Sequence, residues 1–149
     1  MQFSSNLVVS RLTADDYAAW EVLARGYKAF YKTEVSAAEY EATWKRLIQQ
    51  DGVLGVGAQA EGKLIGIVHY LFHTTVWAPK VCYLQDLFVS PESRGKGVAR
   101  ALIEAVVAHA KREQAMRCYW HTQEHNTTAR ALYDNVAKFN GFIRYEIAL

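Results

Sequence analysis

The feature that most constrains the fold is an apolar run, residues 81–89, that passes through a polar, glycine-containing segment, residues 90–97, directly into an amphipathic pattern over residues 98–112. The near-continuous apolar run predicts a strand buried on both faces, at the centre of a sheet. The pattern that follows predicts a helix. Such a strand–loop–helix junction directs unpaired backbone N–H groups to one point, where the helix dipole adds partial positive charge. The sequence therefore predicts an anion site at this junction.

The segment Arg94-Gly95-Lys96-Gly97 supplies the special residues of that site. Its glycines let the backbone approach a phosphate closely, and its Arg and Lys add charge-assisted contacts. Neither common nucleotide-binding pattern fits, because Ser90 occupies the first glycine position of GxxxxGK[ST] and GxGxxG lacks its third glycine. A nucleoside-triphosphate or dinucleotide site is therefore disfavoured. The alternative is that the two glycines only form a tight turn.

Periodicity and turn residues predict the remaining elements. Further strands are expected at residues 7–12, 53–60, 64–72, 116–121 and 142–149, and further helices at residues 13–31, 36–49 and from Asn126 or Thr127 to Gly141. Their order is strand, two helices, three strands, helix, strand, helix, strand. The expected fold class is α/β in the mixed, α+β sense, with the second and third strands antiparallel across the Glu61-Gly62 turn.

Length and charge exclude several function classes. The chain has 149 residues, of which 51% are hydrophobic, and this fits one domain, residues 1–149, with a substantial core. The net charge of +2 comes from residues spread along the chain, so nucleic acid is not an expected partner. The longest uncharged stretch, residues 64–79, is too short for a membrane span. Residues 1–12 lack the order of a signal peptide, which predicts a cytoplasmic protein.

Cysteine and histidine spacing gives no sign of a metal or of a covalent intermediate. Cys82 and Cys118 are too few for a four-ligand zinc site, lack a spaced His or Asp partner, and are interpreted as core residues. His69 and His73 alternate along one expected strand with no third ligand in view. No metal is expected.

Two motifs carry a family resemblance. Arg94-Gly95-Lys96-Gly97-Val98-Ala99, after the strand end Leu87-Phe88-Val89, resembles the [QR]-x-x-G-x-[GA] signature of the GNAT acetyltransferases. Residues 126–133, with Gly141-Phe142 downstream, resemble the Asn-x-x-Ala-x-x-Leu-Tyr segment of that superfamily, followed by Gly-Phe. The resemblance implies the GNAT fold, a central mixed and mostly antiparallel sheet flanked by helices. It also implies that Leu87 to Val89 and Arg94 to Ala99 bind the cosubstrate acetyl-CoA.

Two further stretches are similar to particular branches of this superfamily. Residues 83–89 are similar to the Tyr-Leu-Glu-Asp-x-Phe-Val stretch of the spermidine/spermine acetyltransferases. Residues 119–137 look like the fungal branch that acetylates histones, polyamines or D-amino acids. Gln85 stands where the family has an often catalytic glutamate, so that base cannot be carried over. The spacing from Tyr133 to Gly141 exceeds the common one and suggests an extended last helix.

The resemblance assigns roles to three groups on the donor side. The backbone N–H of Val89 polarises the thioester carbonyl, Tyr133 gives its phenolic proton to the sulfur of CoA, and Asn126 contacts the pantetheine arm. Each side chain also has a plainer interpretation. Tyr133 lies on the apolar stripe of its helix and could be a core residue, and Asn126 could be only an N-cap.

Asp86 is the expected acceptor-side carboxylate. A carboxylate within so apolar a strand is unfavourable unless it is paired, which favours a functional role. In that role Asp86 holds an ammonium or accepts its proton through water. The alternative is a surface aspartate. Glu124 and His121 are fallback bases. The residues expected to line the acceptor site are Tyr31, Glu34, Trp77 and Gln85, with Tyr27 beside them.

The expected function is transfer of an acetyl group from acetyl-CoA to the primary amine of a small molecule, by direct attack of the amine. Acetylation of protein lysines or N-terminal amines, and a non-catalytic acyl-CoA-binding module, are the alternatives. Residues 142–149 alternate between an apolar and a partly charged face, as a strand with one covered face does. We expect a homodimer built around this segment, with a monomer as the alternative.

Overall fold

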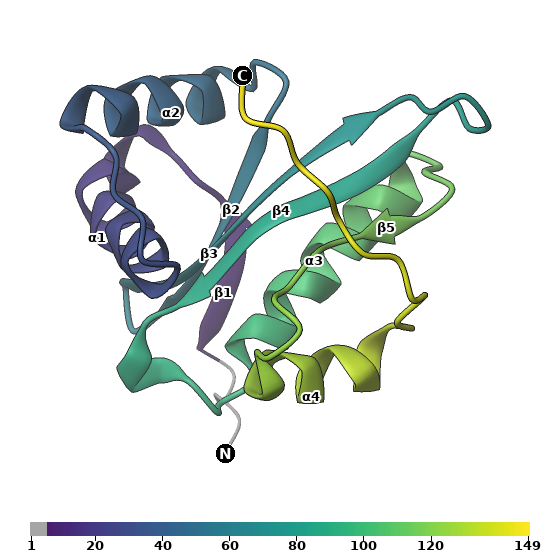
Figure 1. Cartoon of the computed structure of the whole chain (residues 1–149). Helices are drawn as coiled ribbons and strands as arrows, with labels where there is room; N and C mark the ends of the chain where they lie inside the picture. The colour runs from purple at the N-terminus through teal and green to yellow at the C-terminus, as the bar shows by residue number, and fades with distance from the viewer. Residues whose placement is uncertain (1–5) are drawn as a thin grey trace.

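The computed structural model of the chain describes residues 6–149, so the first residues of the 1–12 stretch lie outside the described part. Its centre is a five-stranded sheet in the order β1-β2-β3-β4-β5 (Figure 1). The strands are β1 (Leu7–Arg11), β2 (Leu54–Ala60), β3 (Lys63–His73), β4 (Val81–Val89) and β5 (Cys118–Tyr119). β1 to β4 pair antiparallel, whereas β4 and β5 are parallel. This mixed sheet confirms the expected α+β class.

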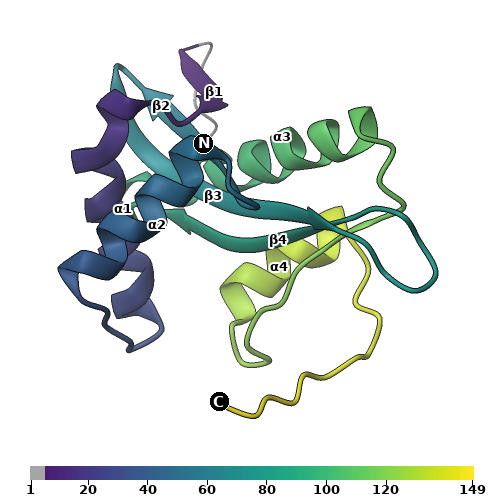
Figure 2. The same ribbon diagram turned by 90° about the horizontal axis from the view of Figure 1, so that it is seen from above.

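The helices cover both faces of the sheet. They are α1 (Tyr17–Phe30), α2 (Ala37–Gln49), α3 (Val98–Arg112) and α4 (Thr127–Val136), with short 3-10 turns η1 (Ala14–Asp16) and η2 (Pro91–Ser93). α1 and α2 lie on one face and α3 on the other, while α4 follows β5 and lies across from α1 (Figures 1 and 2). The expected caps form: Ser36 Oγ accepts from Glu39 N at 3.2 Å, and Asn126 Oδ1 accepts from Ala129 N at 3.4 Å. Within residues 6–149, no helix has the length and apolar character needed to cross a membrane.

Two apolar clusters hold the layers together. The α3-side cluster is centred on Val68, Leu102 and Val106, each with 0% exposure. The α1-side cluster is centred on Trp20 and Ile67, each 1% exposed. Because α1 and α3 are fixed independently on opposite faces, β4 between them has a defined position relative to both.

A bulge in β4 changes which face of the sheet its later side chains point to. Tyr70 is the partner of Leu84 and His69 is the partner of Asp86, so Gln85 is the extra residue. A bulge resets the side-chain alternation. Leu84 before it and Val89 after it both pack in the α3-side cluster. Asp86 thereby turns toward α1, on the same face as Phe88.

β4 and β5 separate soon after they meet. Their pairing is limited to Cys82 with Cys118 and Tyr83 with Tyr119. Beyond Tyr83, no strand within the described chain pairs with this edge of β4. The outer edge of residues 84–89 therefore has no strand partner in the described chain, and we call the space between the diverging backbones of β4 and β5 the gap.

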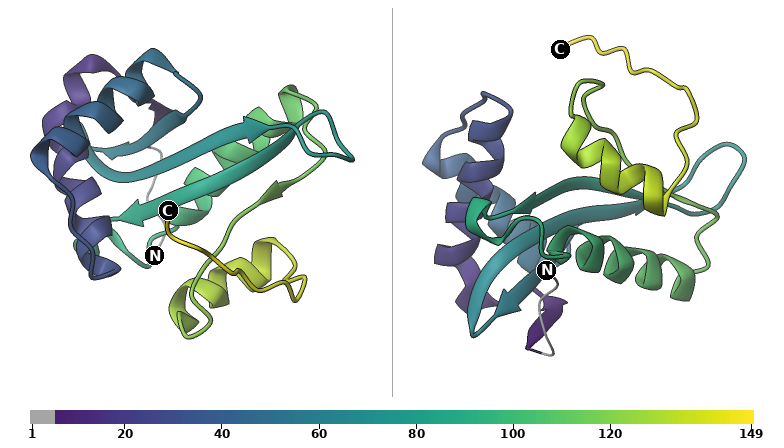
Figure 3. Two further views of the ribbon diagram at one scale, coloured as in Figure 1. Left: turned by 45° about the horizontal axis from the view of Figure 1, so that its top comes forward. Right: turned by 90° about the horizontal axis from the view of Figure 1, so that it is seen from below.

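Three expectations about the C-terminal part are wrong. The last helix ends at Val136 instead of Gly141, residues 142–149 form no strand, and the strand expected at residues 116–121 is reduced to Cys118–Tyr119. Every residue of 137–149 is exposed, so a longer helix would bury no apolar surface there. The segment leaves α4 as an extended trace outside the sheet (Figure 3). Without a neighbouring strand to bond, alternation alone does not make a strand.

Candidate active site

The loop between β4 and α3 has the backbone form that the anion-site prediction requires. Gly95 and Gly97 have φ values of +76° and +84°, a region that glycine adopts most readily. Ser90 fixes the start of the loop, because its N–H donates to Ile65 O at 2.8 Å and its hydroxyl to Ser93 Oγ at 2.9 Å. Since α3 begins at Val98, the N–H groups of its first turn point into this loop.

Arg94 is tied to the end of β4 and does not extend freely. Its Nε donates to Val89 O at 3.0 Å, and its guanidinium carbon lies 5.2 Å from the ring centroid of Phe88 and 5.9 Å from that of Phe30. A guanidinium stacked on aromatic rings is held in place while keeping donors available. Arg94 thus adds positive charge between the loop and the end of α1.

The direction of the Val89 N–H follows from its neighbour. Successive N–H groups along a strand point to opposite edges. Because the N–H of Ser90 bonds to Ile65 of β3, the N–H of Val89 points to the other edge, into the gap between β4 and β5. This is the direction that the predicted carbonyl-polarising role needs.

Tyr133 has a packed ring, as a core residue does, and a phenol that keeps its proton, as a proton donor does. Its ring meets Trp120 edge-on, with centroids 5.5 Å apart, at the margin of the α3-side cluster. Burial, with a smaller contribution from Tyr31, raises the pKa of Tyr133 to about 12. The phenol therefore keeps its proton at neutral pH, and it lies near a residue expected at the acceptor site.

Asp86 lies among tyrosines on the α1 side. Tyr27 donates a hydrogen bond to it, and its negative charge contributes, after burial, to the raised pKa values of Tyr27 and Tyr31. Burial alone would raise the pKa of Asp86, but hydrogen bonds from His69 and Tyr27 and the charge of Lys28 hold it below its ordinary value. The side chain is 22% exposed. Asp86 is thus a stable carboxylate that solvent can still reach.

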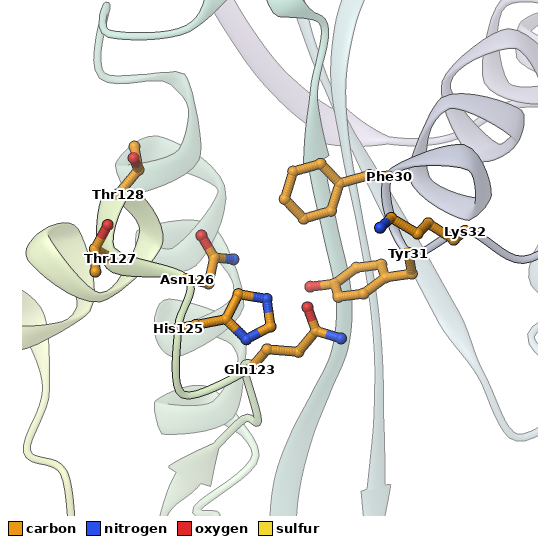
Figure 4. Close-up of a pocket in the computed structure, with 8 residues that line it drawn as sticks. All are labelled: Phe30, Tyr31, Lys32, Gln123, His125, Asn126, Thr127 and Thr128. Carbon is orange, nitrogen blue, oxygen red and sulfur yellow. The ribbon is translucent and has the colours of Figure 1, made fainter.

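A cavity of about 360 Å³ lies between the end of α1 and the start of α4 (Figure 4). Its lining residues are Phe30, Tyr31, Lys32, Gln123, His125, Asn126, Thr127 and Thr128. The Tyr31 hydroxyl points from the end of α1 toward the α4 side (Figure 4). It shares a hydrogen bond with Thr122. Asn126 Nδ2 also donates to Thr122 Oγ1, at 3.3 Å. Tyr31 and Asn126, expected on the acceptor and donor sides, therefore line one cavity.

Three residues expected at the acceptor site do not line this cavity. Trp77 lies in the loop between β3 and β4 and is 89% exposed. Glu34 lines a separate cavity of about 480 Å³ between α1 and α2. Gln85 is the exposed bulge residue. Of the fallback bases, His121 has its Nδ1 3.3 Å from the hydroxyl of Tyr83, and the backbone oxygen of Glu124 accepts from Arg130.

Sequence reasoning missed the contact between His69 and Asp86, which lie 2.8 Å apart. A regular hairpin continuing the pairs of His73 with Val81 and Tyr70 with Leu84 would place Gln85 opposite His69. The bulge places Asp86 there instead. The only sequence signal was the polar character of both residues in apolar strands. Across residues 6–149, no three His, Cys, Asp or Glu side chains gather in a group that could hold a metal ion.

Comparison with known proteins agrees with this geometry. The model of the acetyltransferase (GNAT) family matches residues 17–139. The D-amino-acid N-acetyltransferase HPA3 of Saccharomyces cerevisiae is 34% identical over 139 residues, which cover 90% of this chain and 86% of the yeast protein. The thialysine N-epsilon-acetyltransferase of Caenorhabditis elegans is 25% identical over 111 residues, or 74% of this chain and 69% of that protein.

Solved structures share the fold. The structure of AAC(6')-Iy in complex with a bisubstrate analogue, CoA-S-monomethyl-acetylneamine, superposes with a TM-score of 0.85 at 19% identity, covering 97% of this chain and 99% of the other. At this identity the likeness supports the arrangement of sheet and helices.

Proposed function

The chain belongs to the GNAT family of acetyltransferases and is an N-acetyltransferase that uses acetyl-CoA, and from that premise we propose that its acceptor is the primary amine of a small molecule. The observation that carries the proposal is the Asp86 carboxylate, held ionised and partly exposed beside Tyr27. A carboxylate next to aromatic rings suits an ammonium ligand. The names of the yeast and nematode relatives, for D-amino acids and thialysine, denote acceptors of this kind.

The gap between β4 and β5 suits acetyl-CoA. The pyrophosphate would lie on the loop of Gly95 and Gly97, at the start of α3. The pantetheine arm would lie along the unpaired edge of residues 84–89, much as an added strand does. AAC(6')-Iy, which shares this fold, was solved in complex with a CoA-containing analogue. Bound acetyl-CoA supplies the activated acetyl group. The chain must polarise the carbonyl of that group and protonate the departing sulfur.

Val89 and Tyr133 would act on the two ends of the thioester. The Val89 N–H, which points into the gap, would donate to the carbonyl oxygen as negative charge develops there. Tyr133, whose pKa of about 12 keeps it protonated, would donate to the departing sulfur. Both donors would then be positioned before the reaction, so neither would have to be reorganised as the transition state forms.

Asp86 is better suited to binding an ammonium than to deprotonating it beforehand. An alkyl ammonium has a pKa of about 10, whereas a carboxylate has one of about 4 and that of Asp86 is lower. Proton transfer before attack is therefore unfavourable by roughly six pKa units. Asp86 would attract the ammonium and orient its nitrogen. The fraction of bound amine that has lost one proton to solvent would attack, and Asp86 would take the second proton as attack makes that nitrogen acidic.

A screen of amines for CoA release in the presence of acetyl-CoA tests the proposal. The panel contains polyamines, D- and L-amino acids, thialysine and a lysine peptide. We expect turnover with one or more small amines. Turnover with the lysine peptide alone would instead support a protein acetyltransferase, and tight acetyl-CoA binding with no acceptor would support a binding module.

The donor site is tested separately by ligand-induced stabilisation. Acetyl-CoA at 100 times its Kd should stabilise the native state by about 2.7 kcal/mol and raise the Tm, whereas NAD and ATP should not. Equal shifts from all three ligands would contradict the proposed loop function.

We also propose a homodimer in which residues 142–149 of each copy are covered by the other. Phe142, Tyr145 and Ile147 are each more than 80% exposed, at 82%, 87% and 86%. An extended apolar segment of this kind is an unfavourable surface until it is covered.

A further inference from the structure

A buried chain of hydrogen bonds links α1 to Asp86 through His69. Trp20 Nε1 donates to His69 Nε2 at 2.9 Å, and His69 Nδ1 lies 2.8 Å from Asp86 Oδ2. Trp20 is 1% exposed and His69 is 9% exposed. The three residues come from α1, β3 and β4, so this chain crosses the interface between the helix and the sheet.

The partners fix the tautomer of His69. The indole N–H of Trp20 can only donate, so Nε2 of His69 must accept and carries no proton. The single ring proton of a neutral His69 is therefore on Nδ1, from which it is donated to the carboxylate of Asp86. A second proton on Nε2 would break the bond to Trp20 and leave a buried indole N–H without its partner.

The chain has one end that solvent can reach. Trp20 and His69 are enclosed, whereas the Asp86 side chain is 22% exposed. One carboxylate oxygen, Oδ2, is occupied by His69. A carboxylate can accept further hydrogen bonds, so Asp86 retains capacity for Tyr27 and for an incoming ammonium.

We propose that His69, held by Trp20, is a positioning residue that orients the Asp86 carboxylate toward the acceptor amine. The inference rests on the acceptor-binding role proposed for Asp86. With His69 neutral, the site keeps the full negative charge of Asp86 for the substrate. The bulge at Gln85 is what makes the contact possible, because it brings Asp86 opposite His69.

Nuclear magnetic resonance of the imidazole nitrogens tests the hydrogen-bond chain without any catalytic assay. In the 15N-labelled protein, a long-range 1H–15N spectrum at neutral pH should show the ring proton of His69 on Nδ1 and none on Nε2. The signals are assigned by their loss in His69→Asn. An imidazolium, or a proton on Nε2, would overturn the proposal.

Trp20→Phe tests the effect on catalysis. It keeps an aromatic ring in the α1-side cluster but removes the donor, so Nε2 of His69 becomes free to protonate. The kcat/KM for the amine should fall by about 10- to 100-fold, the range for one hydrogen bond to a charged group. The pH profile should also gain an acidic limb, because a proton on the freed Nε2 would place a positive charge beside Asp86. The titratable or charged groups facing Asp86 are His69 from β3, Tyr27, Lys28 and Tyr31 from α1, and Tyr83 from β4.

Trp44→Phe is the matched control. The ring of Trp44 lies 5.0 Å from that of Trp20 in the same cluster but takes no part in the hydrogen-bond chain. It should leave the pH profile unchanged. If both variants lower kcat/KM equally and without an acidic limb, Trp20 only packs and the proposal is wrong.

A second pair of variants separates positioning from the role of Asp86 itself. His69→Asn keeps an amide donor near Asp86, whereas His69→Leu has none, so the Asn variant should retain more activity. The KM for acetyl-CoA should stay constant in both. If Asp86→Asn impairs catalysis while His69→Leu does not, the positioning role fails and the proposed function stands. If Asp86→Asn is fully active, the acceptor role of Asp86 fails, and the positioning inference falls with it.

Discussion

β3 and residues 142–149 are both rich in apolar side chains, but only β3 forms a strand. Residues 63–73 form a nearly continuous apolar run and are buried along most of their length, whereas residues 142–149 alternate between an apolar and a partly charged face and are all exposed. β3 has a strand on each side, since it pairs with both β2 and β4. Residues 142–149 have no strand beside them in the described chain. Alternation predicts which face a strand buries, but an available edge decides whether the strand forms.

The presence or absence of a neighbouring strand also distinguishes the candidate site from the C-terminal segment. The candidate site lies where β4 is fixed on one edge by β3 and left open on the other by β5. The C-terminal segment has neither constraint. Equivalent substitutions in the two regions should therefore have very different effects.

The largest contrast is expected between two tyrosines. Tyr133→Phe removes a phenol at the site and should lower kcat by about 10²- to 10⁴-fold, with little change in acetyl-CoA affinity. Tyr145→Phe, in the exposed segment, should leave kcat unchanged. Steady-state kinetics with the best acceptor measures both. Unchanged kcat in Tyr133→Phe would return this residue to a purely structural role.

A second contrast concerns stability. Leu102 belongs to α3 and is fully buried, so Leu102→Ala should lower the free energy of unfolding by about 2–5 kcal/mol at any protein concentration. Ile147→Ala should matter only where the dimer is populated. Urea denaturation at two protein concentrations distinguishes them. A concentration-independent loss in Ile147→Ala would mean that residues 142–149 dock within their own chain.

The oligomeric state tests what covers the exposed segment. Light scattering at micromolar concentration should give the mass of a dimer, and deletion of residues 145–149 should weaken it. A monodisperse monomer would contradict the proposed interface. A dimer that persists undiminished after the deletion would show that another surface holds it.

The smallest expected effect is on the alkaline pH dependence. Because the pKa of Tyr133 is raised to about 12, its protonated form persists through pH 10, where an ordinary tyrosine would be half ionised. At saturating substrates, kcat should show no tyrosine limb between pH 8 and 10. A fall in kcat centred near pH 10, absent from the residual activity of Tyr133→Phe, would contradict the buried phenol.

The sequence predicted the bounds of β4 and α3 closely and the edge of the sheet poorly. The expectation that residues 81–89 form the central strand is wrong, because β4 is fourth of the five strands and β3 is central. β4 and α3 have the expected bounds, because a continuous apolar run and a glycine loop leave few alternatives for residues 81–112. The sequence could not reveal the length of β5, because that depends on where two strands diverge. It likewise could not reveal that residues 142–149 lack a partner edge.

The candidate site divides in the same way. The loop of Gly95 and Gly97 was predictable because its chemistry is local to the chain. The contact of Asp86 with His69 was not predictable. It depends on a one-residue bulge at Gln85, and a glutamine, unlike a glycine, does not indicate a bulge. Trp77 was placed at the acceptor site by resemblance, yet it lies in an exposed loop of this chain.

The most direct test of the account is the KM for the acceptor amine in Asp86→Asn. The substitution is nearly isosteric but removes the negative charge that is proposed to bind the ammonium. At neutral pH we predict a KM for the amine raised by about 10- to 100-fold, the range for a charged hydrogen bond, with the KM for acetyl-CoA and the Tm little changed. An unchanged amine KM in the folded variant would contradict the claim that Asp86 holds the acceptor.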